Sequence, residues 1–381
     1  MLQKHFETLT DVRVQGRTKH NLLEIVLITI CAVMTGIDAW WQIADFARVK
    51  AQWFREKLGL ELKRGVPSHD TFQRVFELID PKEFERCFVE WVRAAVKSTE
   101  GEIVSIDGKT LRGSRRAMQP PLHLVSAWAK KSKLVLGQIR TKDKSNEITA
   151  IPELLKLLEL KGCIVTIDAM GTQVEIADKI VKQGNDYVLA VKGNQPNLHK
   201  DIWMYFDECL CNESQYFEGN RLKTSEKGHG RIEKRKYYLE TDIAWLTQKT
   251  EWSGIKAIGM VECETDRNGK ITTERRHYIT TLTEVEKFAE AVRAHWGVEN
   301  SLHWCMDVTF REDASTISVN HAAENFAVVR RIALNLTKHY DTGAKEKMSV
   351  RAKLKKCEYD ADFMSDVLLT CLLDQPKTFD A

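Results

Sequence analysis

The spacing of apolar residues changes near Gly101, and this change limits the fold more than any other feature of the sequence. Before Gly101, apolar side chains recur at helical intervals, as Phe84, Phe88 and Trp91 do. We therefore predict a helical N-terminal domain over residues 1–98. Several short helices joined by turns fit either a DNA-binding module or a packing domain, and the sequence favours neither.

After Gly101 the pattern becomes that of short strands, which then alternate with helices. Three successive strands followed by alternating helices and strands predict an α/β fold, with a mixed sheet flanked by helices. The expected strands cover residues 103–106, 123–129, 134–139, 163–167 and 187–191, and the expected helices cover 148–160, 174–182 and 197–210.

A second strand-rich stretch interrupts this alternation. Strands are expected at 232–239, 255–263 and 271–281, so residues 211–284 form a β-rich insertion. Helices resume at 285–304 and 322–339. The predicted organisation is a second domain over 99–340 that contains this insertion, followed by a C-terminal tail over 341–381.

The net charge does not identify a partner, but its distribution does suggest one. The 57 Lys and Arg exceed the 54 Asp and Glu by only three. Basic residues nevertheless concentrate in three blocks: ten against one acidic residue in 108–144, seven against two in 221–238, and nine against two in 330–356. Such blocks are either solvated faces or surfaces for a polyanion.

Cysteine usage and hydropathy give the expected location. The nine Cys are scattered and form no CxxC pair, which is typical of a reducing cytoplasm. The longest apolar stretch, 25–37, is too short to span a bilayer and lacks a signal-peptide pattern. We expect a cytoplasmic protein with no membrane role.

Two carboxylates directly follow predicted strands. Asp107 comes after the strand at 103–106, and Asp168 comes after the strand at 163–167. If these strands are neighbours, the two side chains could lie a few Å apart at one edge of the sheet. The alternative is structural: Asp107 would open a turn with Gly108, and Asp168 would cap a helix.

A third acidic residue lies on the predicted helix at 285–304. His295, Glu299 and His303 are four residues apart, so they should share one helical face that could point at the sheet edge. Gly297 lowers helix stability and suggests close approach to its backbone. The alternative is a surface helix with satisfied histidines. A zinc hydrolase using His295 and His303 is a distant possibility, because no HExxH spacing is present.

Three converging carboxylates imply a metal. Two unit charges 4 Å apart repel by about 4 kcal/mol at an effective dielectric constant of 20. Ligands that are only oxygens select Mg²⁺ or Mn²⁺ over zinc. Two such ions suit an in-line phosphoryl displacement, and the basic blocks could hold a polyanion with phosphodiesters beside them.

The chain resembles the DDE transposases of bacterial insertion sequences, and within them the H-repeat-associated protein family. The resemblance covers nearly the whole chain. Its motifs are Pro67-Ser68-His69-Asp70-Thr71-Phe72, Ile106-Asp107-Gly108-Lys109, Ile167-Asp168-Ala169-Met170, His295-Trp296-Gly297-Val298-Glu299-Asn300 and Leu302-His303-Trp304. The resemblance implies a ribonuclease-H-like core in which Asp107, Asp168 and Glu299 are catalytic and ligate two Mg²⁺ or Mn²⁺ ions.

The sequence departs from one pattern of related transposases. Relatives with Tyr-x2-Arg-x3-Glu-x6-Lys around the glutamate would require Tyr, Arg and Lys where this chain has Val292, His295 and Met306. Glu299 is kept. The partners that contact phosphate must therefore be other residues, with Arg293, His295 and His303 as candidates.

The implied activity is DNA transposition: hydrolysis of phosphodiesters at the element's ends, then transfer of the freed 3′-hydroxyl into target DNA. Double-stranded DNA is the expected partner, and the chain should be a homodimer when bound to it. The candidate DNA-binding residues are Lys109, Arg112, Lys192, Arg231, Arg235, His295 and His303. Two alternatives remain: a metal-dependent nuclease that does not join strands, and an inactive DNA-binding remnant of a mobile element.

Overall fold

The computed structural model describes residues 2–14, 16, 18–96, 98–115, 120–141, 147–211, 220–228, 230–343 and 347–372, with side chains to residue 369. The chain forms two compact units. The first comprises Met1–Ser98, Gly108–Asn146 and Glu299–Ala381, and the second comprises Thr99–Asp107 and Glu147–Val298. The units are not consecutive stretches of sequence, because the chain passes from one to the other within its first strand.

The first unit is mainly helical and includes the predicted N-terminal helices. Its helices are α1 (Leu2–Phe6), α2 (Leu22–Met34), α3 (Trp40–Val49), α4 (Ala51–Leu58), α5 (His69–Leu78), α6 (Pro81–Ala95), α11 (Ala322–His339), α12 (Val350–Tyr359) and α13 (Ala361–Leu372). The segment after residue 340, expected to be a tail, thus contains two helices. None of the described helices of the chain is long and apolar enough to cross a membrane.

Helix α11 is the centre of the first unit. It is buried along nearly its whole length, and Phe326 packs edge-to-face against Trp40 with ring centroids 5.3 Å apart. Asn325 donates to the backbone oxygens of Phe76 and Ile79, at 2.9 and 3.0 Å, which ties α11 to the end of α5. The helical domain predicted over 1–98 therefore packs around a helix that lies more than 220 residues later.

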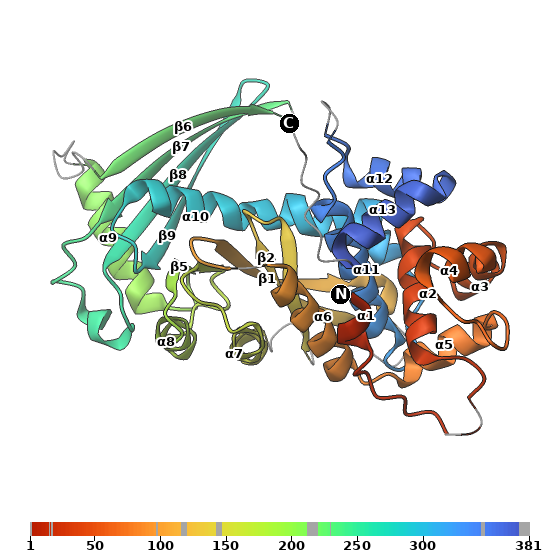
Figure 1. Cartoon of the computed structure of the whole chain (residues 1–381). Helices are drawn as coiled ribbons and strands as arrows, with labels where there is room; N and C mark the ends of the chain where they lie inside the picture. The colour runs from red at the N-terminus through yellow and green to blue at the C-terminus, as the bar shows by residue number, and fades with distance from the viewer. Residues whose placement is uncertain are drawn as a thin grey trace, which may run out of the picture. The chain divides into compact units, whose positions relative to one another are not determined.

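The strands form one mixed sheet in the order β3-β2-β1-β4-β5-β9-β8-β7-β6. The strands, drawn in Figure 1, are β1 (Ile103–Leu111), β2 (Leu122–Ala129), β3 (Leu134–Thr141), β4 (Ile164–Ile167), β5 (Asp186–Val191), β6 (Arg221–Gly228), β7 (Arg231–Glu240), β8 (Ala257–Arg267) and β9 (Lys270–Thr280). Strand β4 pairs in parallel with both β1 and β5. The remaining neighbours from β5 onward, namely β5–β9, β9–β8, β8–β7 and β7–β6, are all antiparallel pairs. This mixed α/β sheet confirms the coarse prediction of the fold class.

Local sequence explains where several strands begin and end. Strands β8 and β9 meet at Asn268-Gly269, both with positive φ (53° and 86°), which is the two-residue turn that suits a twisted hairpin. Strand β6 was not predicted, because its residues are almost all exposed and show no apolar alternation. Strand β1 extends four residues beyond the predicted Asp107 and includes it.

The second unit also contains helices α7 (Glu147–Leu158), α8 (Val174–Lys182), α9 (Pro196–Cys211) and α10 (Val285–Val298). Helix α10 packs on the insertion strands through Phe288, whose ring lies directly over Gly259 of β8. A Cβ at Gly259 would lie 2.4 Å from the Phe288 ring, so only glycine fits there. By contrast, a Cβ at Gly297 would have no other described atom of the chain within 4 Å. The close approach to the Gly297 backbone that we expected is therefore not made by the described residues.

These two glycines give a matched pair for a stability test. Gly259→Ala should lower the free energy of unfolding by roughly 1–3 kcal/mol, because the Phe288 ring must shift in a packed core. Gly297→Ala should raise it by about 0.5–1 kcal/mol, because alanine restricts the unfolded chain and fits the helix. Equilibrium denaturation with urea measures both. Equal effects of the two substitutions would contradict the packing described here.

Candidate active site

Asp107 and Asp168 occupy neighbouring positions on paired parallel strands. Ile106 of β1 pairs with Ile167 of β4, and an aspartate follows each of them: Asp107 within β1, and Asp168 directly after the end of β4. The preceding pair, Ser105 and Thr166, is joined by a hydrogen bond that Thr166 donates to Ser105 at 2.9 Å. Because alternate residues of a strand share a face, Asp107 lies on the face of Ser105, and Asp168 lines one cavity together with Thr166. Both aspartates are half-buried.

The structural alternatives for the two aspartates are wrong. Strand β1 continues through Gly108 to Leu111, so Asp107 does not open a turn. Helix α8 begins after Gln173, so Asp168 is not its cap. Asp168 instead accepts a hydrogen bond from the Gly171 backbone at 3.2 Å, within the loop that follows β4.

His295 joins this face of the sheet from helix α10. Its Nδ1 lies 3.0 Å from the Thr166 hydroxyl, which fixes the ring beside β4. Burial lowers the pKa of His295, and the nearby charge of Asp168 partly opposes this effect. Within the second unit, His295 therefore lies close enough to Asp168 to feel its charge.

A cavity of about 100 Å³ opens next to Asp168. Its polar and aromatic lining includes Asp168, Lys192, Arg276, His277, His295 and Trp296. Lys192 follows β5 and is exposed. The loop that bears it is held to the loop after β4, because Asn194 donates to Ala169 and Gln195 donates to Thr172. A basic side chain thus lies at the rim of a cavity that contains a carboxylate.

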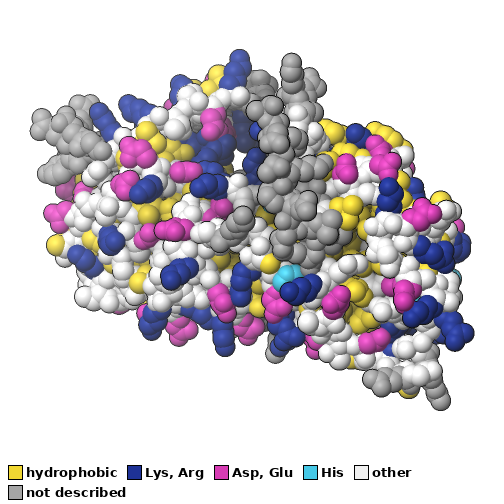
Figure 2. All heavy atoms as spheres, in the orientation of Figure 1, with side chains coloured by type: hydrophobic (Ala, Val, Ile, Leu, Met, Phe, Trp, Pro, Cys, Tyr) yellow, Lys and Arg dark blue, Asp and Glu magenta, His cyan; other side chains and the backbone are white. Residues whose placement is uncertain are grey.

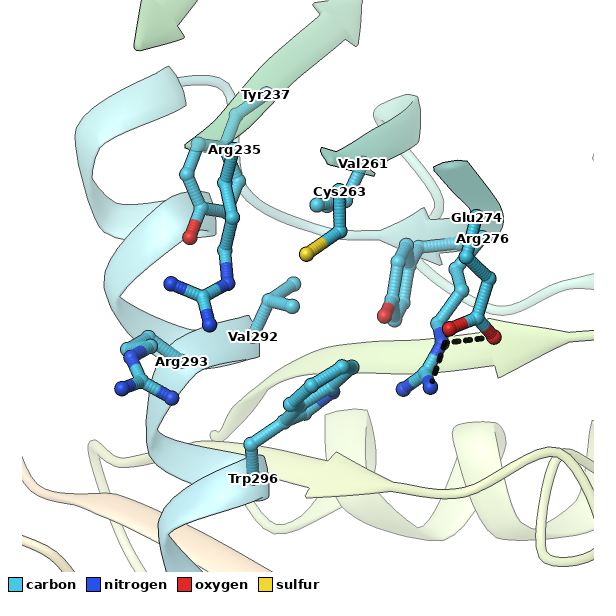
Figure 3. Close-up of a pocket in the computed structure, with 10 residues that line it drawn as sticks. Arg235, Tyr237, Val261, Cys263, Glu274, Arg276, Val292, Arg293 and Trp296 are labelled. Atoms are coloured by element: carbon cyan, nitrogen blue, oxygen red, sulfur yellow. Dashed lines mark hydrogen bonds and ion pairs between the residues drawn. The ribbon is translucent and has the colours of Figure 1, made fainter. Parts of the chain in front are cut away.

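A group of arginines surrounds Trp296, which also lines this cavity. The Arg276 guanidinium lies over the indole ring, 4.0 Å from its centroid, and Arg235 lies 5.8 Å from it. Figure 3 shows Arg235 and Arg293 to one side of Trp296 and Arg276 to the other, where it is bonded to Glu274. Arg276 and Trp296 were not singled out from the sequence, although Trp296 is next to His295.

The two residues of strand β7 that were predicted to contact DNA, Arg231 and Arg235, lie on the more buried face of the strand. Arg235 is 3% exposed and is paired with Glu226 and Glu233, while Arg231 is half-buried and paired with Glu233 at 2.9 Å. The opposite face carries the exposed Lys234 and Lys236, so the two-residue periodicity is as predicted. The Arg235 guanidinium is held by the chain's own carboxylates.

Lys109 and Arg112 follow Asp107 but differ sharply in exposure. Lys109 is 8% exposed, and its ammonium donates to Asp307 and Glu312. The Arg112 side chain is 87% exposed, with Asp313 as its nearest partner at 3.7 Å. Only Arg112 of these two presents its charge to solvent.

Glu299 and His303 lie beyond the last turn of α10, where the helix changes type. Residues Glu299–His303 and Cys305–Thr309 are π-helical. A π-helix bonds i to i+5 and has more residues per turn than an α-helix. His295 and His303 are half-buried and Glu299 is exposed, and the common face expected for the three residues stays a prediction.

The exposed Glu299 begins the part of the chain that belongs to the first unit, whereas Asp107, Asp168 and His295 belong to the second. In the described part of the chain, no three His, Cys, Asp or Glu side chains are grouped so as to hold a metal ion. The pairing of β1 with β4 thus gives two of the three predicted carboxylates neighbouring positions, and the metal-binding role of all three stays a prediction.

Comparisons with known proteins agree on one family. Residues 98–336 match the family model "Transposase DDE domain", and residues 3–92 match the model "DDE_Tnp_1-associated". The chain is 38% identical over 378 residues to "Putative transposase YncI" of Escherichia coli O157:H7, which covers 97% of this chain and 95% of the relative. It is also 38% identical over 378 residues to "H repeat-associated putative transposase YhhI" of Escherichia coli strain K12, covering 96% and 97%.

A solved structure, "Cryo-EM structure of piggyBac transposase synaptic complex with hairpin DNA (SNHP)", matches with a TM-score of 0.42 and 10% identity. The match covers 99% of this chain and 82% of that chain.

A buried histidine at the cavity gives a pH-dependent prediction. His277 is 4% exposed, with its Nδ1 3.3 Å from His199 Nε2. Burial, with His199 and Arg275, lowers the pKa of His277 from 6.5 to about 4. A lowered pKa means that the unfolded chain binds the proton first, so stability is present above pH 6.5 and is lost as the pH falls toward 4.

His277→Gln should therefore remove about 2 kcal/mol of the stability loss between pH 7.5 and pH 5, the interval over which only the unfolded chain protonates. Denaturant unfolding at the two pH values measures the difference. His339→Gln, which changes a terminal residue of α11, is the control and should leave the loss as it is. A His277→Gln profile that parallels the parent protein would show that His277 titrates normally in the folded state.

Proposed function

The chain belongs to the family of transposases with a DDE domain, and from this membership we propose that it is a Mg²⁺-dependent DNA transposase that cleaves element ends and joins them to target DNA. The observation that carries the proposal is the parallel pairing of Ile106 with Ile167, because Asp107 and Asp168 are the residues that directly follow this pair. Strands β3-β2-β1-β4-β5 would be the ribonuclease-H-like core of such an enzyme.

The residues present fit a divalent metal. Two carboxylates at adjacent positions repel each other unless a cation lies between them. Their donor atoms are all oxygens, which Mg²⁺ and Mn²⁺ prefer. We propose that Asp107, Asp168 and Glu299 hold two such ions, which supply charge stabilisation for an in-line displacement at phosphorus when bound.

The remaining side chains would bind and orient the DNA. Lys192 and Arg112 present exposed cations that can contact DNA phosphates. Arg231, Arg276, His295 and His303 are further candidates. Lys109 and Arg235 are not among the contacts that we propose, because both are buried and held by carboxylates.

Joining two ends of one element requires both to be held at once. We therefore propose that the protein acts as a homodimer on DNA, with one catalytic site for each end.

The catalytic assignment predicts that Asp107→Asn, Asp168→Asn and Glu299→Gln each reduce Mg²⁺-dependent cleavage of element-end DNA by at least about 100-fold, because each removes a metal ligand. Binding of the same DNA should stay within about twofold, because the phosphate contacts remain. Incubation of the purified protein with its flanking DNA, with Mg²⁺ or EDTA, followed by sequencing of the products, measures cleavage and joining.

Asp178→Asn is a matched control, because Asp178 lies on the surface of α8 in the second unit and pairs only locally with Lys182. It should cleave normally. Retained cleavage in any of the three test variants would remove that residue from the site. Cleavage without joining by the parent protein would favour a nuclease, and binding without cleavage would favour an inactive remnant.

The DNA-binding assignment predicts a change in salt dependence. Lys192→Ala and Arg112→Ala should each reduce the slope of log K against log salt by about 0.9, because each removes one phosphate contact. Fluorescence anisotropy with labelled end DNA at several salt concentrations measures the slope. Lys249→Ala changes an exposed lysine outside the cavity and should leave it unchanged. An unaltered slope in Lys192→Ala would place the DNA elsewhere.

A further inference from the structure

Four charged side chains form a buried network in the first unit: Lys109, Asp307, Glu312 and Arg331, hereafter the buried ion network. The Glu312 and Arg331 side chains are 0% and 1% exposed and are paired with each other, and Lys109 bonds both acidic members. The second Glu312 oxygen accepts from Lys109 at 3.1 Å. Every member therefore has an opposite charge in contact.

Glu312 carries its negative charge at neutral pH. Burial alone would raise the pKa of Glu312, but Arg331 and Lys109 outweigh it and hold the pKa at about 2. Buried ion pairs often contribute little net stability, because desolvation offsets the attraction, whereas removing one partner is costly. The arrangement therefore points to a role in fixing geometry more than in adding stability.

The network joins three parts of the chain that are distant in sequence. Lys109 belongs to β1, Asp307 to the π-helical segment after Glu299, and Arg331 to α11. The segment after Asp107 also contacts the segment after Glu299 outside the buried ion network, because the Arg112 backbone N–H donates to the Asp313 carboxylate at 3.2 Å. A Cβ at Gly113 would lie 2.6 Å from the Asp313 backbone oxygen, so the two segments touch at main-chain distance.

Two members of the buried ion network lie close in sequence to proposed metal ligands. Lys109 follows Asp107 by two residues of extended strand, about 7 Å. Asp307 follows Glu299 by eight residues of continuous helical backbone. The network thus binds the chain that follows one proposed metal ligand to the chain that follows another.

We propose that Lys109 and Glu312 are positioning residues, which fix the end of β1 two residues after Asp107 and the segment that follows Glu299, and so support metal binding by these proposed ligands. This inference rests on the proposed function. It assigns a purpose to Lys109 that differs from phosphate contact, and it requires no contact of either residue with DNA.

The test measures Mn²⁺ binding directly, by electron paramagnetic resonance on the full-length protein without DNA. Lys109→Met and Glu312→Gln should each raise the Kd for Mn²⁺ about tenfold, as loss of a supporting contact does at other metal sites. Affinity for end DNA should change by less than about twofold, because the phosphate contacts are untouched. Lys109→Arg, which keeps the charge and the donors, should restore most of the Mn²⁺ affinity.

Two further variants keep the test decisive. Asp307→Asn changes the most exposed member of the network, so it should fold even if Lys109→Met does not, and should shift Mn²⁺ affinity in the same direction. Lys287→Met is the control, since Lys287 pairs with Glu284 on the surface of α10 and should have no effect. Unchanged Mn²⁺ affinity in folded Lys109→Met or Asp307→Asn overturns the inference.

Failure of the inference can be told apart from failure of the proposed function. Asp107→Asn should abolish Mn²⁺ binding if the metal site is correctly assigned. If it does, and the network variants bind Mn²⁺ normally, only the positioning role is lost. If Asp107→Asn binds Mn²⁺ as the parent does, the metal site itself is wrong, and the positioning role falls with it.

Discussion

The hydrogen-bonded pairing of β1 with β4 is the constraint on which the candidate site depends. It aligns Ile106 with Ile167 in parallel register, so the aspartates that follow are neighbours whatever their side-chain rotamers. A slip of one residue would send one carboxylate to the opposite face of the sheet. The Ser105–Thr166 hydrogen bond and the Thr166–His295 contact reinforce the same register from the polar side. Strand pairing, rather than loop conformation, therefore locates the two acids.

Much of this arrangement could be read from the sequence, because strand and helix periodicities are local properties. The strands at Asp107 and Asp168 were predicted to within a few residues, and their neighbouring positions followed as a condition on sheet order. The change from α-helix to π-helix at Glu299 could not be predicted, since it leaves the apolar pattern unchanged. Strand β6 was missed for a related reason: an exposed strand has no apolar alternation to detect.

The basic blocks show where sequence reasoning about charge stops. Lys109, Arg235 and Arg331 each belong to one of the three blocks, yet all are buried and paired with carboxylates. The partners of Arg235 lie in the same block, but those of Lys109 lie about two hundred residues away, so a local count does not include them. Figure 2 shows the remaining surface cations interleaved with acidic side chains on the visible face. Exposed cations such as Lys192 and Arg112 can be separated from structural ones only when the tertiary partners are known.

Strand β6 is the last strand of the sheet order and leaves one row of backbone groups without a further strand. Such an edge invites another chain to add to it, the first step toward fibrils. Arg221, Lys223 and Lys227 along this strand are exposed, and their like charges would oppose those of an identical strand laid beside them. The positive charges along β6 thus disfavour edge-to-edge pairing of two copies of this insertion.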